Sequence, residues 1–136
     1  MKILFSADWH IKVGQKNVPR EWQINRYEML FKKLHELEEQ VDIHIIGGDI
    51  FDKSPNPQEL ALYYEFVKWC GIETIIYDGN HEATRKGKTF LSFLERATTY
   101  INSNVNIVSG ILHTLDPNTK KPLFDIIPVS YTHLTL

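Results

Sequence analysis

Short apolar runs alternate with longer amphipathic segments along this chain, and that alternation constrains its fold more than any other feature of the sequence. The apolar runs predict buried strands at residues 3–7, 43–46, 72–77 and 105–108. The segments between them, at 21–40, 57–70 and 90–101, have the apolar spacing of helices. Strands that alternate with helices pair mostly in parallel, in a sheet covered on both faces. The sequence therefore predicts an α/β fold in β-α-β-α-β-α-β order.

Local signals refine this prediction. Asn56 can cap the second helix, Pro57 suits its first position, Glu59 completes a spacing typical of the capping box, and Gly71 is expected to end it. The apolar stripes of the three helices are Ile24, Tyr27, Leu30, Phe31, Leu34 and Leu37; Leu60, Tyr63, Tyr64 and Val67; and Phe90, Phe93, Leu94, Ala97 and Ile101. After the last strand, two apolar runs flank the polar turn "DPNTKKP" and predict a hairpin.

Composition adds a few bounds. A chain of 136 residues with 43% hydrophobic residues suits one globular domain, and its formal charge of −2 neither indicates nor excludes binding of nucleic acid. The single cysteine, Cys70, cannot form an intrachain disulfide and is expected to pack in the core, as in a protein of a reducing compartment. No signal peptide or membrane span is visible, so we expect a cytoplasmic protein with no membrane partner.

Polar clusters follow three of the expected strands directly. They are "DWH" with Asp8 and His10, "GGD" with Asp49, and "GNH" with Asn80 and His81. The carboxyl ends of parallel strands share one edge of the sheet, so these residues can meet although they are far apart in sequence. Carboxylate, amide oxygen and imidazole are ligands of divalent metals such as manganese. Glycines beside Asp49 and Asn80 allow the backbone to turn tightly near an ion.

Each residue taken singly has a simpler interpretation. An aspartate after a strand is usually a cap or a turn residue, and a single histidine is usually a packed or surface residue, which is our interpretation of His35, His44 and His113. Asp52 is expected to support the site or the local structure, and Phe51 to lie in the core. The conjunction of complementary ligand types at three strand ends favours a metal site over these alternatives.

In this order, "DWH", "GGDIFD" and "GNHE" resemble the opening motifs of calcineurin-like metallophosphoesterases. The longer "GGDIFDKSPNP" is similar to the SbcD-type DNA-repair nucleases of bacteria and bacteriophages. The resemblance implies two divalent ions, manganese in this family, with Asp8 and His10 binding one ion, Asp49 bridging both and Asn80 binding the second. His81 then contacts the phosphate and donates a proton to the leaving oxygen, which is general acid catalysis.

The resemblance extends to about Pro128 and implies a two-sheet sandwich flanked by helices. The implied activity is two-metal-dependent hydrolysis of DNA phosphodiester bonds in repair or recombination, by an exonuclease or endonuclease. The implied partners are DNA and an SMC-like ATPase of the SbcC type, and a homodimer stays open. Two alternatives also stay open: a phosphoesterase that acts on phosphomonoesters or small diesters, and a non-catalytic interaction scaffold.

Basic residues lie close to the expected site. We expect Arg85, Lys86 and Lys88, with Lys12 and Lys16 from the first loop, to contact DNA phosphates, and a solvated basic loop is the alternative. Glu82 can orient His81 or begin a helix.

The ligand set implied by the family is incomplete in this sequence, because the three later histidines of the family have no counterpart. His113 has the wrong spacing for the first of them. Residues 129–136 resemble a translated sequencing adapter, so His133 is not expected to be a ligand. We therefore expect residues 1–128 to be the N-terminal part of a phosphoesterase domain followed by a non-native tail, with little or no activity of its own.

Overall fold

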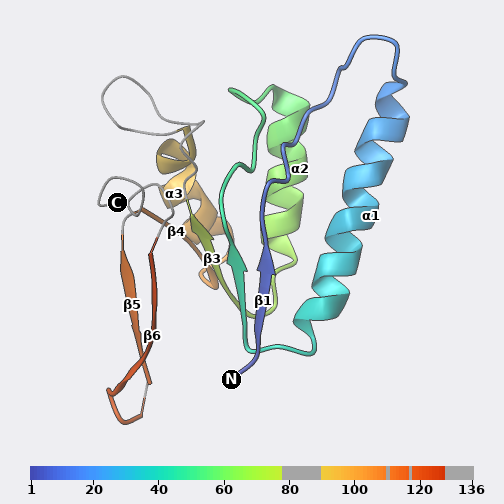
Figure 1. The fold of residues 1–136 in the computed structure, drawn as a ribbon. Helices are drawn as coiled ribbons and strands as arrows, with labels where there is room; N and C mark the ends of the chain where they lie inside the picture. The colour runs from blue at the N-terminus through green and yellow to red at the C-terminus, as the bar shows by residue number, and fades with distance from the viewer. Residues whose placement is uncertain (78–89, 110, 117, 128–136) are drawn as a thin grey trace, which may run out of the picture.

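The computed structural model describes residues 1–77, 90–109, 111–116 and 118–127. Four strands form one parallel sheet in spatial order β1-β2-β3-β4: β1 (Ile3–Ser6), β2 (Ile43–Ile46), β3 (Glu73–Tyr77) and β4 (Val105–Val108). Three helices follow the first three strands in turn: α1 (Arg20–Glu38), α2 (Pro57–Lys68) and α3 (Phe90–Ile101) (Figure 1). The α/β class and the element order predicted from the sequence are confirmed.

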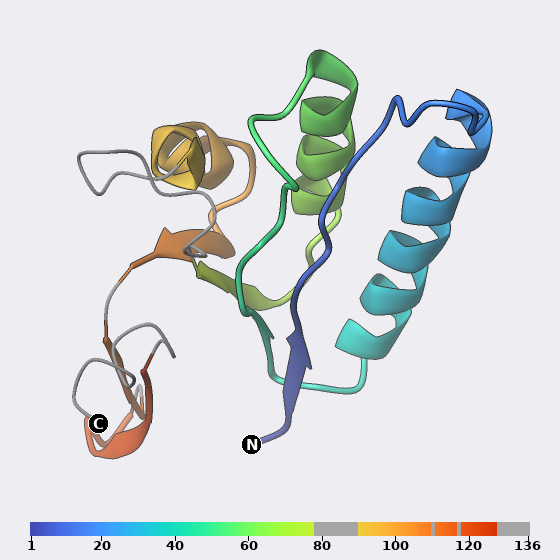
Figure 2. The same cartoon turned by 45° about the horizontal axis from the view of Figure 1, so that its top comes forward.

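The three helices lie on one face of the sheet (Figure 2). Ile46, Ile76 and Ile107 from the strands pack there against aromatic and aliphatic side chains of all three helices. A hairpin of β5 (Leu112–Leu115) and β6 (Pro122–Ile126) packs against the opposite face, over the buried Ile45 and Ile75. The predicted hairpin is therefore confirmed, and it supplies the second sheet of the fold.

The hairpin leaves the edge strand β1 open. On the same face of the sheet, the side chains of Ile3 and Phe5 are 44% and 65% exposed. The second face is thus covered over β2 and β3 but not over β1, within the part of the chain that the structure describes. None of the described helices is long and apolar enough to span a membrane.

The start of α2 follows the prediction from its sequence. The Asn56 side chain accepts a hydrogen bond from the Glu59 backbone N–H, and the Glu59 carboxylate accepts one from the Asn56 N–H, each at 2.8 Å. The predicted end at Gly71 is wrong, because the helix ends at Lys68 with Trp69 as its cap. Gly71 does not take up the positive φ that makes glycine an effective stop signal.

The predicted stripe of α3 is wrong in part. Leu94 is buried as predicted, but Phe93 and Ile101 are 65% and 44% exposed and Ala97 is also exposed, while the side chain of Phe90 lies outside the described set. Leu91 and Thr98 face the core instead. The inward position of Thr98 is satisfied by the hydrogen bond of its hydroxyl with the buried Tyr63 hydroxyl, at 2.8 Å.

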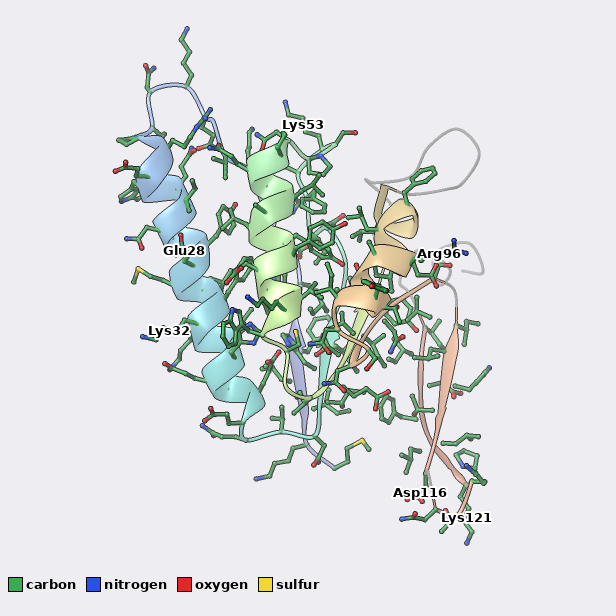
Figure 3. The ribbon with its side chains drawn as sticks, turned by 180° about the vertical axis from the view of Figure 1, so that it is seen from behind. Glu28, Lys32, Lys53, Arg96, Asp116 and Lys121 are labelled. Atoms are coloured by element: carbon green, nitrogen blue, oxygen red, sulfur yellow. The ribbon has the colours of Figure 1, made fainter. Side chains whose placement is uncertain are left out.

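Helix α1 buries Phe31 and Leu34 as its pattern predicts, but it also buries Gln23 and Glu38, and Leu30 is 38% exposed. Charged side chains such as Glu28 and Lys32 project from its outer face (Figure 3). The polar residues on its inner face have partners in other elements, described below.

Candidate metal centre

The segments that follow β1 and β2 stay paired beyond the ends of the strands. The backbone N–H groups of Asp8, His10 and Ile11 donate to the carbonyls of Gly48, Asp49 and Ile50, at 3.1, 2.9 and 2.7 Å. This pairing holds the turn that carries Asp8 and His10 beside the turn that carries Asp49. Adjacent parallel strands therefore bring these three residues together, as the sequence predicts.

All three residues adopt a backbone conformation that is rare for residues other than glycine. Their φ angles are 57° at Asp8, 46° at His10 and 53° at Asp49. Among the described residues only Asn17 and Lys120 share this property. Left-handed conformations cost on the order of 1–3 kcal/mol each and concentrate at functional sites. Gly48, with φ of 109°, completes the turn where only glycine is unstrained.

The side chains converge on one point. Each residue offers one potential ligand atom, and these atoms lie within 4.8 Å of one another. The Nε2 atom of His10 is 4.0 Å from a carboxylate oxygen of Asp8. Asp49 is half-buried, whereas the Asp8 side chain is 70% exposed and that of His10 46% exposed, so the cluster opens to solvent. Trp9, between the two exposed potential ligands, points the other way and is buried in the core.

The donor set fits a divalent cation. Two carboxylates and an imidazole at one solvent-accessible edge supply the oxygen and nitrogen ligands that manganese and similar ions accept. Without a cation, two carboxylates in such proximity repel each other, so binding a cation removes an unfavourable interaction. The cluster is therefore competent to bind at least one divalent ion.

Asp52 supports His10 from the side opposite to the cluster. Its carboxylate lies 3.6 Å from His10 Nδ1 and 3.4 Å from Lys12 Nζ. When a histidine binds a metal through one ring nitrogen, a carboxylate beside the other ring nitrogen commonly orients the ring. Lys12, predicted to contact DNA, is engaged with Asp52 in this structure, whereas Lys16 is exposed. Phe51 is buried in the core as predicted.

Helix residues also hold the loop that follows Asp8 and His10. The Tyr27 hydroxyl donates to the His10 carbonyl at 2.7 Å and accepts from the Lys12 N–H at 3.2 Å. Burial raises the pKa of Tyr27, so this hydroxyl stays protonated. Glu59 of the capping box also accepts from the Val13 N–H at 2.7 Å. From their sequence, Tyr27 and Glu59 could be assigned only to their own helices, because a local pattern does not identify a partner in a distant loop.

Several predicted site residues lie outside the described part of the chain. They are Asn80, His81, Glu82, Arg85, Lys86 and Lys88; His133, which is not expected to be a ligand, also lies outside the described residues. Their assigned roles stay predictions. His113 lies on the exposed surface of the hairpin and pairs with Asp125 at 2.8 Å, which agrees with a surface interpretation.

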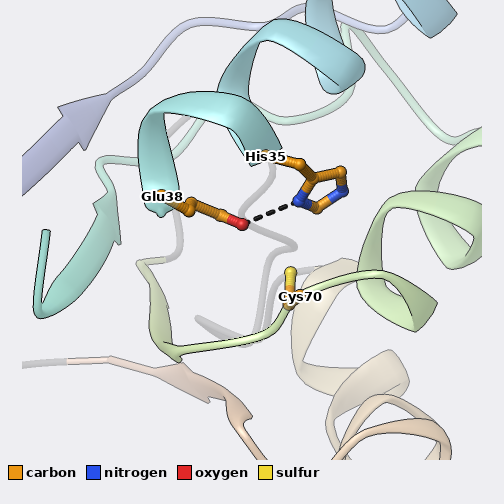
Figure 4. A group of neighbouring side chains, drawn as sticks. All are labelled: His35, Glu38 and Cys70. Carbon is orange, nitrogen blue, oxygen red and sulfur yellow. Dashed lines mark hydrogen bonds and ion pairs between the residues drawn. The ribbon is translucent and has the colours of Figure 1, made fainter. Parts of the chain in front are cut away.

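A second group of potential ligand atoms lies inside the fold. His35, Glu38 and Cys70 also bring one such atom each within 4.8 Å (Figure 4). The Glu38 carboxylate bonds with Nδ1 of His35 and with Nδ1 of His44, both at 2.7 Å. Burial raises the pKa of the Cys70 thiol to about 12, so the thiol keeps its proton. Hydrogen bonding accounts for this group without an ion, and Cys70 is buried as predicted.

The charge of Glu38 is stabilised in spite of its burial. Desolvation is the largest single influence and opposes ionisation, but hydrogen bonds and charge from His35 and His44 together outweigh it and lower the pKa of Glu38. His35 and His44 are packed residues, as the sequence suggested. Their shared carboxylate was missed, since Glu38 reads as an ordinary charged residue near the end of an amphipathic helix.

Comparison with known proteins gives a consistent result. The family model described as calcineurin-like phosphoesterase matches residues 1–130. The probable exonuclease subunit 1 of Escherichia phage T5 is 38% identical over 136 residues, which is 98% of this chain and 40% of that protein. A subunit of the SbcCD nuclease of Staphylococcus epidermidis is 29% identical over 111 residues, covering 77% of this chain and 29% of the relative. The chain thus spans two fifths or less of the curated relatives it matches.

Proposed function

The chain belongs to the calcineurin-like phosphoesterase family, and from that premise we propose that it contributes metal ligands to a nuclease that hydrolyses DNA phosphodiester bonds. The divalent ions of this family are proposed to be manganese here. The names of the relatives, an exonuclease subunit and a subunit of the SbcCD nuclease, support DNA as the substrate and an ATPase of the SbcC type as a partner.

Each residue at the strand ends has a proposed role. Asp8 and His10 bind one ion, Asp49 bridges two, and Asn80 binds the second. When bound, the pair of cations acts as a Lewis acid on the phosphoryl oxygens. His81 donates a proton to the leaving deoxyribose oxygen. Asp52 keeps the His10 ring in position with Nε2 toward the cluster.

One observation carries this proposal. Asp8, His10 and Asp49 are left-handed at all three positions while their ligand atoms converge. A turn that needed only to connect secondary structure elements would relax to unstrained angles or use glycine. Three of the five left-handed residues other than glycine among those described are these convergent ligand types, which supports a site that holds an ion.

The activity is tested in a chimera, because the chain matches only part of its relatives. Residues 1–128 replace the matched segment of the phage T5 exonuclease subunit, and degradation of linear double-stranded DNA is followed with and without Mn²⁺. We expect manganese-dependent degradation that Asp49→Asn abolishes. The matched control is Asp125→Asn, which removes the charge of a hairpin carboxylate and should leave the activity unchanged.

A small chromogenic phosphodiester, assayed in parallel, distinguishes the alternatives. Hydrolysis of the small diester without degradation of DNA would favour a small-molecule phosphoesterase. A folded chimera that hydrolyses neither substrate and binds no Mn²⁺ would favour a scaffold and contradict the proposed function.

A further inference from the structure

Two polar side chains lie on the helix-covered face of the sheet among apolar neighbours. Ser6 ends β1, and His44, fully buried, lies near the middle of β2. In the register of the parallel sheet, Ser6 pairs with Ile46 and Leu4 with His44, so the two polar residues are diagonal neighbours on one face. A buried imidazole in a strand reading "IHII" is costly unless its polar atoms are satisfied.

A chain of hydrogen bonds satisfies these atoms. The Glu38 carboxylate can only accept, so Nδ1 of His44 carries the hydrogen in their 2.7 Å bond. In neutral His44, Nε2 is then the acceptor, and it bonds with the Ser6 hydroxyl at 2.8 Å. The Ser6 oxygen in turn accepts from the indole N–H of Trp9 at 3.3 Å. The chain therefore runs from the end of α1, through β2, to the turn after β1.

Trp9 connects this chain to the strained turn. It lies directly between Asp8 and His10 in sequence, and its ring packs against Phe31 and Phe66 with centroid distances of 5.1 and 4.7 Å. Packing fixes the plane of the ring, and the bond to Ser6 fixes its rotation within that plane. Trp9 thus anchors the turn in the core, between two left-handed residues whose side chains are exposed, Asp8 and His10.

We propose that Ser6, His44 and Glu38 form a positioning network that pre-organises the Asp8–His10 turn for metal binding. The effect on metal binding rests on the proposed function, whereas the effect on the conformation of the turn does not. None of the three residues belongs to the group of potential ligands formed by Asp8, His10 and Asp49. Partners that bond directly to a metal ligand typically affect metal affinity by 10–100-fold when they are removed, and this network acts one residue further away, through Trp9.

The test compares two variants, each of which removes one hydroxyl that makes a buried or partly buried hydrogen bond. Ser6→Ala breaks the network between His44 and Trp9, whereas Thr98→Val breaks the bond with Tyr63 on the far side of α2. Ser6→Thr restores a hydroxyl and serves as the rescue. Two quantities are measured in each: amide hydrogen exchange at Asp8, His10 and Ile11, and the Kd for Mn²⁺ from titration.

We expect Ser6→Ala to accelerate exchange at these three amides by about tenfold or more and to raise the Kd for Mn²⁺ by about tenfold. Thr98→Val should lower thermal stability without either effect, and Ser6→Thr should return both toward the wild-type values. Unchanged exchange in Ser6→Ala, or equal acceleration in Thr98→Val, overturns the inference. Accelerated exchange in a chain that binds no Mn²⁺ supports the network and contradicts the proposed function instead.

Discussion

Removing the carboxylate of Glu38 should destabilise the fold far more than its place near a helix end suggests. Glu38 is 3% exposed, and both of its oxygens accept from imidazole N–H groups at 2.7 Å. Glu38→Ala leaves the donors of His35 and His44 without their acceptor. The His44 side chain is fully buried, so its donor loses this acceptor away from bulk water.

The expected loss follows from these two bonds. Two imidazole donors lose their acceptor, and each buried donor left unpaired costs about 1–3 kcal/mol, toward the upper end where the lost acceptor is charged. We therefore expect Glu38→Ala to lower the free energy of unfolding by about 3–5 kcal/mol. For a domain of this size, that corresponds to a fall in Tm of roughly 10–20 °C.

The same contacts predict a pH dependence. In the folded chain the pKa of Glu38 lies below its ordinary value of 4.5, so the unfolded chain binds this proton first as the pH falls. The stabilisation is present above pH 4.5 and is lost as the pH falls through the folded pKa. The difference in unfolding free energy between wild type and Glu38→Gln should shrink over that window.

Urea denaturation followed by circular dichroism measures both effects. Glu36→Ala is the matched control, because Glu36 lies in the same turn of α1 but is exposed, and it should change stability by less than about 0.5 kcal/mol. A loss for Glu38→Ala no larger than that of Glu36→Ala would refute the reasoning. The reasoning would also be refuted if the difference in unfolding free energy between wild type and Glu38→Gln grew as the pH fell below 4.5.

Three further predictions follow from other parts of the fold. Gly48→Ala should destabilise the fold by about 1–3 kcal/mol, because φ at this position is 109°. Gly71→Ala should be neutral or slightly stabilising, because Gly71 has an ordinary φ and no atom lies within 4 Å of the added methyl group. Thermal melts of the two variants test both expectations. Cys70, with a pKa of about 12, should react with a thiol reagent at pH 8 only as fast as the chain unfolds, and rapid labelling of the native protein would contradict its burial. Replacing Arg85, Lys86 and Lys88 with alanine should reduce the salt slope of DNA binding by about three, and an unchanged slope would remove these residues from the proposed DNA contact.

Much of the fold could be predicted because its signals are local. The capping box of α2 is contained in four consecutive residues, and the strands β2 and β4 are short apolar runs whose bounds match the prediction. The inward face of α3 could not be predicted in this way. Thr98 turns inward because Tyr63 offers it a hydrogen bond, and a pattern of apolar residues contains no record of that partner.

The grouping of the three potential metal ligands was predictable for a reason of topology. Residues directly after neighbouring parallel strands must lie close together, so Asp8, His10 and Asp49 could be grouped without coordinates. Their left-handed backbone and the contact between Asp52 and His10 could not be anticipated. The buried chain from Glu38 to Ser6 was missed because histidine and serine in a strand have no local signature of their partners.

The most direct measurement of the central claim uses Mn²⁺ as a paramagnetic probe. In a titration followed by amide NMR, we expect the signals of Asp8, His10 and Asp49 to broaden first, while the β5–β6 hairpin is unaffected. Asp49→Asn should abolish the selective broadening, and Asp125→Asn should preserve it. Broadening that spreads evenly over the surface carboxylates, or that survives Asp49→Asn unchanged, would contradict the assignment of this edge of the sheet as a metal centre.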